Sequence, residues 1–142
     1  MLDSNVLIDA FRDADENESL QAFHLRFAPG EYLSSVVALE LLSGTRSLAD
    51  RRTLEHHWLR RFIAANRVIT PSPAAWRRSG DVLRTLRARE GLDVSRVSKA
   101  FGNDILLALS CREAGMVLIT KNARDFGRIA RVTAFEFVAP WP

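Results

Sequence analysis

The sequence has few metal-binding soft ligands: one cysteine, Cys111, and three histidines among 142 residues. A single cysteine excludes an internal disulfide, which is typical of proteins from a reducing compartment, so we expect a cytoplasmic protein. The sequence also has no cysteine and histidine set of the kind that zinc prefers. Because Cys111 lies among apolar residues, we expect it to be a small buried side chain and not a nucleophile.

Long apolar runs are also lacking. No run approaches the roughly 20 residues that span a bilayer, and the chain start lacks the basic segment and apolar core of a signal peptide. The sequence contains no internal repeat, low-complexity segment or linker. Its length therefore predicts one domain, residues 1–142, that buries a core without disulfides. A net charge of +3 and a pI near 9.7 favour, weakly, a polyanionic partner.

Segments with helical spacing alternate with short apolar runs. Helices are predicted at residues 6–11, 20–27, 36–43, 46–66, 73–90 and 103–114. Strands are predicted next to Asp3 and at residues 32–34, 67–70, 116–120 and 132–138. This alternation predicts an α/β domain with a mainly parallel sheet that is covered on both faces.

Polar segments and small residues set the expected boundaries. Residues 13–19 and 91–99 are predicted to be loops, and residues 121–126 a turn. Ser35 and Ser72 are expected N-caps. Three glycines are expected to end helices: Gly44, Gly91 and Gly115.

Four carboxylates occupy positions that have both an ordinary and a functional explanation. Asp3 and Asp104 each precede or open a predicted helix, so either is an N-cap or a functional acid. Glu40 lies in an otherwise apolar helix, where it either faces solvent or points into a cleft. Asp125 follows a predicted strand and is either a turn residue or part of a site.

The predicted sheet would bring several of these residues together. Ligands bind beyond the carboxyl ends of parallel strands, where Asp3, Ser34–Ser35 and Thr120–Asn122 are expected. Carboxylates that meet there raise one another's pKa, and hard cations such as Mg²⁺ or Mn²⁺ relieve the repulsion. With a basic surface, such a site suggests phosphodiester cleavage by metal-activated water, with a second metal stabilising the leaving oxygen.

Three segments carry a family resemblance: LDSNVLID (Leu2–Asp9), SSVVALELLSG (Ser34–Gly44) and NDILLALSCREAGMVLITKNARDF (Asn103–Phe126). In this order and spacing they resemble PIN-domain proteins, above all the VapC-like toxins of bacterial type II toxin–antitoxin modules. The resemblance implies a three-layer α/β/α sandwich with a mainly parallel, roughly five-stranded sheet. It also implies a Mg²⁺- or Mn²⁺-dependent endoribonuclease, a small antitoxin partner that covers the crevice, and homodimers that pair further with the antitoxin.

The resemblance also implies roles for single residues. The catalytic and metal-binding acids would be Asp3, Glu40 and Asp104. Site-shaping residues would be Ser4, Asn5, Thr120 and Asn122. Some family members have an aspartate where this chain has Asn122, so either Asp125 replaces it as a metal ligand or three acids suffice. Only two residues precede Asp3, so we expect a short first strand or a natural start elsewhere.

Basic residues and apolar helix faces around the predicted site are candidates for binding RNA and protein partners. Arg46, Arg96 and Lys99 are expected to steer the RNA backbone. The apolar faces of the helices at 6–11, 20–27 and 46–66 are expected to line an antitoxin groove or a dimer interface.

Two other functions compete with the ribonuclease. One is a catalytically silent PIN-like module that only binds nucleic acid or the antitoxin. The other is a phosphatase with Asp3 as a covalent nucleophile, although such enzymes need a second carboxylate where this chain has Asn5. The sequence does not indicate which RNA would be cut.

Overall fold

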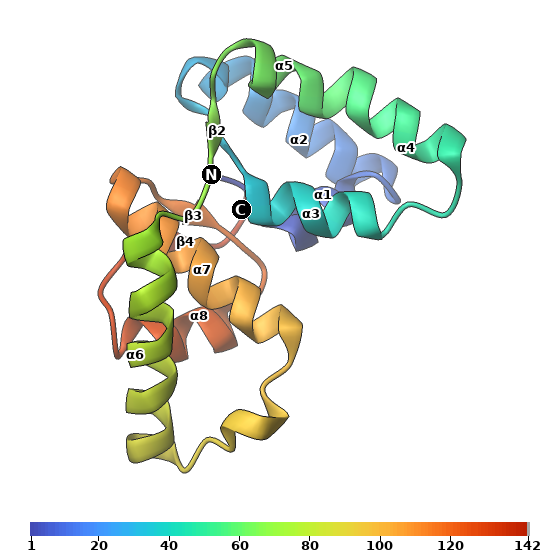
Figure 1. Ribbon diagram of the computed structural model, residues 1–142. Coiled ribbons are helices and arrows are strands. Elements are labelled where there is room, and N and C mark those ends of the chain that lie inside the picture. Colours follow the sequence, from blue (N-terminus) through green and yellow to red (C-terminus); the bar gives the residue numbers. More distant parts are fainter. Residues whose placement is uncertain (142) are drawn as a thin grey trace.

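The computed structural model describes residues 1–141, and short strands lie between two groups of helices (Figure 1). One group holds α1 to α5 and the other α6 to α8 (Figure 1). The α-helices are α1 Ser4–Ala10, α2 Ala14–Phe27, α3 Ser35–Ser43, α4 Leu48–Leu54, α5 Arg60–Ala64, α6 Pro73–Glu90, α7 Lys99–Ala114 and α8 Ala123–Ala130. Short 3₁₀ turns are η1 Ala28–Gly30 and η3 Val94–Arg96, and η2 Glu55–Leu59 is a π-helical segment.

The strands are two residues long and pair in parallel. They are β1 Leu33–Ser34, β2 Val68–Ile69, β3 Leu118–Ile119 and β4 Phe137–Val138. β1 pairs with β2 and β3 with β4, and Leu2 forms an additional parallel bridge to Ile119. These five extended segments confirm the predicted α/β architecture with helices on both sides. The strands are shorter than predicted, and only the end of the 132–138 segment is a strand.

Two corrections concern the ends of helices in the first half of the chain. The prediction of a loop at residues 13–19 is wrong, because Asp13 caps α2 by accepting hydrogen bonds from the backbone N–H groups of Asp15 and Glu16. Acidic residues in a first helical turn also interact favourably with the helix dipole. The cap of α3 is Ser34 and not Ser35.

Two further corrections concern the second half. α7 begins at Lys99 behind the N-cap Ser98, so Asp104 lies inside the helix and the N-cap explanation for it is wrong. The predicted turn at residues 121–126 is the start of α8, which Asn122 caps. An amphipathic helix of eight residues between two polar segments leaves only a weak periodic signal.

The long helix predicted at residues 46–66 is continuous but not regular. Ser47 caps α4, and the π-helical segment η2 separates α4 from α5. The predicted ends of α6 and α7 are confirmed, because Gly91 and Gly115 have φ of 67° and 63°, a left-handed conformation that suits glycine.

The core surrounds α7. Ile105, Leu107 and Leu109 of this helix are buried together with Leu118 of β3. Cys111 is also buried, as predicted, and burial raises the pKa of its thiol to about 11. Within residues 1–141, no helix combines the length and the apolar character needed to cross a membrane.

Candidate active site

The candidate site lies where the first extended segment and β3 end. Asp3 directly follows the Leu2 bridge, and Thr120 directly follows β3. α3 and α7, which carry Glu40 and Asp104, approach the same edge. The predicted convergence of strand ends therefore brings these four residues into one neighbourhood, whereas Ser34 is engaged in capping α3.

Asp3 is almost completely buried, with 3% of its surface exposed, and both carboxylate oxygens are bonded. Oδ1 accepts a hydrogen bond of 2.7 Å from the backbone N–H of Ser4. Oδ2 accepts bonds of 2.7 Å from the Asn5 amide and 2.6 Å from the Thr120 hydroxyl. Asp3 is therefore the N-cap of α1 and a member of the acidic cluster at once.

The hydrogen-bond donors around Asp3 are uncharged, so no positive charge among them lowers the pKa of its carboxyl group. Burial raises the pKa of Asp3 above its ordinary value, and the charge of Glu40 adds to the rise. The hydrogen bonds from Thr120, Ser4 and Asn5 act in the opposite direction.

Glu40 points toward the same cluster from α3. Its Oε2 accepts a hydrogen bond of 2.5 Å from the Ser4 hydroxyl, and its Oε1 accepts one of 2.9 Å from the Asn103 amide. The alternative of a purely solvated helix position therefore does not describe Glu40. Asn103 has no role in the sequence prediction, although its place beside Asp104 was a signal for one.

Asp104 is the acid with the weakest protein contacts. Its Oδ2 accepts a bond of 3.2 Å from the Asn122 amide, which also donates to Asp125 at 3.3 Å. Burial raises the pKa of Asp104 to about 7, and the charges of Asp3, Glu40 and Asp125 contribute. Asp125 also lies 3.6 Å from the Arg128 guanidinium, which partly compensates its charge.

The donor set fits a hard divalent cation. Carboxylate, amide and hydroxyl oxygens are the ligands of Mg²⁺ and Mn²⁺, and the site contains no thiolate or imidazole. The acids are close enough for three of them to raise the pKa of a fourth, Asp104. In the described part of the chain, no three acidic, histidine or cysteine side chains are already arranged to hold a metal ion together.

An open groove of about 750 Å³ adjoins Glu40 between α1, α3 and α4. Its walls combine aromatic and charged side chains, among them Phe11, Arg12, Arg46, His57 and Trp58. Of the three predicted RNA-steering residues, Arg46 lines the same groove as Glu40. Arg96 lies in η3 and pairs with Asp93 at 3.3 Å, and Lys99 is exposed at the start of α7.

Solved structures share this fold over nearly the whole chain. A chain of DNA-bound VapBC from Salmonella typhimurium matches with a TM-score of 0.71 and 25% identity, covering 99% of this chain and 97% of that one. A chain of VapBC2 from Rickettsia felis, bound to a promoter DNA fragment, matches with 0.67 and 22%, covering 100% and 98%. A chain of FitAcB from Neisseria gonorrhoeae matches with 0.70 and 18%, covering 99% and 96%.

Comparison of the sequence with curated proteins and with family models identifies the family. No curated protein matches the chain significantly. The family model described as PIN domain matches residues 1–132, the part of the chain that contains all four acids of the candidate site. The chain therefore belongs to the PIN domain family.

Proposed function

We propose that the chain is a Mg²⁺- or Mn²⁺-dependent endoribonuclease and the toxin of a cytoplasmic toxin–antitoxin pair. The observation that carries this proposal is the cluster of Asp3, Glu40 and Asp104, held by neutral donors and not by cations, with the pKa of Asp104 raised to about 7. Membership of the PIN domain family, whose members are generally nucleases, supports the same reaction class.

Asp3, Glu40 and Asp104 would hold the cation, with Asp125 as a further ligand. When bound, the cation supplies Lewis-acid chemistry: it polarises the phosphodiester and lowers the pKa of water. Asp3 is already oriented by Thr120, Ser4 and Asn5, so its carboxylate does not have to be ordered on binding.

The remaining polar residues prepare the site and its surroundings. Ser4 and Asn103 fix the two oxygens of Glu40, and Asn122 lies between Asp104 and Asp125. A proton bound to Asp104 must leave before a cation binds there, so affinity for the cation rises with pH. Arg46, which lines the same groove as Glu40, would neutralise part of the RNA backbone charge, and cleavage would leave a 5′-phosphate and a 3′-hydroxyl.

The partner proposal rests on the groove beside Glu40. Three of the similar solved structures are those of VapBC2, VapBC and FitAcB. Phe11 and Trp58 give the groove an aromatic wall, which suits the apolar face of an antitoxin segment that would cover the acids at the same time. A homodimer that assembles further with the antitoxin stays a prediction, which molar-mass measurements with and without the antitoxin test.

Cleavage of RNA by the purified chain tests the enzymatic proposal. We expect cleavage with Mg²⁺ or Mn²⁺, none with EDTA, and none by Asp3→Asn. Asp81→Asn is the matched control, because Asp81 lies on α6 and is exposed. The proposal is wrong if the wild type cuts no RNA, or if Asp3→Asn cuts as fast as the wild type.

Binding of the metal alone separates the enzyme from a silent binding module. For the enzyme we expect Mg²⁺ or Mn²⁺ to raise the melting temperature, and Glu40→Gln to abolish the increase. A module that only binds nucleic acid or an antitoxin predicts no metal-dependent shift. The phosphatase alternative lacks support, because the residue two positions after Asp3 is an amide that donates to it.

A further inference from the structure

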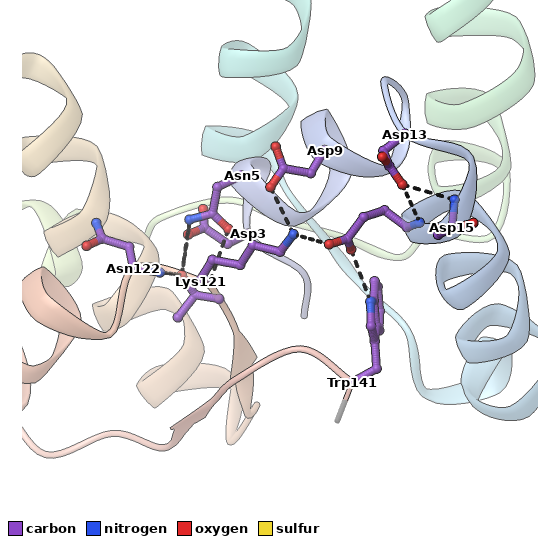
Figure 2. A network of polar contacts seen from close by, with 10 residues as sticks. Asp3, Asn5, Asp9, Asp13, Asp15, Lys121, Asn122 and Trp141 are labelled. Atoms are coloured by element: carbon purple, nitrogen blue, oxygen red, sulfur yellow. Dashed lines mark hydrogen bonds and ion pairs between the residues drawn. The ribbon is translucent and has the colours of Figure 1, made fainter.

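Lys121 lies at the edge of the candidate site without contacting its acids. It directly follows Thr120, the residue whose hydroxyl donates to Asp3. Figure 2 shows that the end of its side chain lies at Asp9. Lys121 therefore belongs to the same turn as the site but directs its charge elsewhere.

The charged end of Lys121 joins two helices. Its Nζ lies 2.9 Å from Asp9 Oδ2 on α1 and 2.6 Å from Glu16 Oε1 on α2 (Figure 2). Glu16 is held from its other side, because the indole N–H of Trp141 donates to Oε2 at 3.2 Å. Only about a third of the Lys121 and Glu16 side-chain surface is exposed, at 31% each, so solvent screens these pairs less than ordinary surface pairs.

The backbone of the same residue contacts Asn5. The Lys121 N–H donates to Asn5 Oδ1 at 3.2 Å. With Oδ1 occupied in this way, the Asn5 Nδ2 faces the site, where it donates to Asp3 at 2.7 Å and to Thr120 at 3.2 Å. A flipped Asn5 amide would turn its oxygen toward the Asp3 carboxylate, which repels it.

We propose that Lys121 is a positioning residue that, through Asp9 and Glu16, holds the β3–α8 turn so that Asn5 and Thr120 orient Asp3. Lys121 acts through geometry. Its charged Nζ contacts Asp9 on α1 and Glu16 on α2, at 2.9 and 2.6 Å. The kinetic part of the test rests on the proposed ribonuclease function, and the spectroscopic part does not.

The spectroscopic test compares full-length variants without metal or RNA. Lys121→Met keeps the backbone N–H but removes the two ion pairs. We expect the Asn5 side-chain amide resonance to move and its protons to exchange with solvent at least about threefold faster. Lys121→Arg should restore the wild-type signal. Arg84→Met, which removes an exposed ion pair with Asp81 on α6, should leave it unchanged.

The kinetic test separates positioning from contact with RNA. We expect Lys121→Met and the Asp9→Asn, Glu16→Gln double variant each to lower kcat about tenfold, with KM within about twofold of wild type. Asp9→Asn alone, a milder change, should lower kcat less and keep the fold. The proposal is overturned if the Asn5 signal of Lys121→Met is that of the wild type. It is also overturned if Lys121→Met raises KM while the double variant has wild-type kinetics, because Lys121 would then bind RNA directly.

Discussion

Two buried carboxylates in this protein have opposite environments. Asp3 and Glu31 are 3% and 5% exposed. Glu31 lies 2.6 Å from His24 Nδ1 and 4.0 Å from the Arg61 guanidinium, so basic side chains face it. Asp3 accepts only neutral hydrogen bonds from described residues, namely from Ser4, Asn5 and Thr120.

The difference separates a structural acid from an acid that can bind a cation. Arg61, which faces Glu31, also lies over the rings of Trp58 and Phe62 at 4.5 and 4.7 Å, so the Glu31 cluster ties α2 to the η2–α5 segment. The charge of Asp3 has no such partner, and burial raises its pKa. A buried charge that the protein leaves uncompensated costs stability, and a bound cation would relieve that cost.

The largest effect is expected from Asp3→Asn. RNA cleavage should fall by at least about 10³-fold, because the variant lacks the carboxylate that we propose as a metal ligand. The metal-free protein should differ little in stability from the wild type, because removal of the buried charge offsets the loss of one of the two oxygens that accept hydrogen bonds from Ser4, Asn5 and Thr120. Denaturant titration measures the free energy of unfolding, and a clear loss of stability would contradict the comparison.

Glu31→Gln is the matched change in the other cluster. It should lower the free energy of unfolding by about 3 kcal/mol, because Arg61 and His24 lose their buried partner. The fraction that remains folded should cut RNA at the wild-type rate. If Glu31→Gln instead lost activity at full stability, the division between structural and functional acids would be wrong.

A smaller effect is expected from pH. The pKa of Asp104 is about 7 in the folded protein and near 3.8 without the fold, so the folded state binds the proton more tightly. The stabilisation that the Asp104 proton gives to the folded state is complete below pH 3.8. It is lost as pH rises through about 7, the pKa of Asp104 in the folded protein. The free energy of unfolding without metal should therefore fall by about 1–2 kcal/mol between about pH 5 and pH 8, since Asp104 is only partly buried.

Asp104→Asn provides the control for this pH dependence. The variant should show a shallower profile in the same interval, with a remaining slope from Asp3, whose pKa is also raised, and should exceed the wild type in stability at the alkaline end. With Mg²⁺ present, the wild-type profile should reverse, because the cation binds the ionised acid. An unchanged slope in Asp104→Asn would assign the titration to another group.

The smallest effect is expected from Asn122→Asp, which supplies the fourth acid that some family members have. Without metal, the variant should lose about 1 kcal/mol, because a carboxylate replaces the amide between Asp104 and Asp125. Its affinity for Mg²⁺, measured by calorimetry, should rise about tenfold. Asn122→Ala should lose stability without gaining affinity; a gain there would show that the added charge is not the cause.

Local signals explain which helices the sequence predicts well. Ser72 followed by Pro73 marks the start of α6, and the glycines after α6 and α7 mark the ends of these two helices. The acids were also recognisable, since each lies in a short motif. The start of α2 and the whole of α8 could not be recognised in the sequence. Their acidic and polar residues resemble a loop but form helices that Asp13 and Asn122 cap.

The sequence alone therefore determines the family, the alternating α/β order and the acids that surround the site. Only the tertiary structure decides which neutral and charged partners those acids receive. Asn103 reaches Glu40 across 63 positions, and Lys121 reaches Asp9 across 112. Such contacts depend on how whole helices pack, and no local pattern of residue types records that packing. Asp3 and Glu31 look alike in the sequence for the same reason: their difference lies in what the fold brings to each carboxylate.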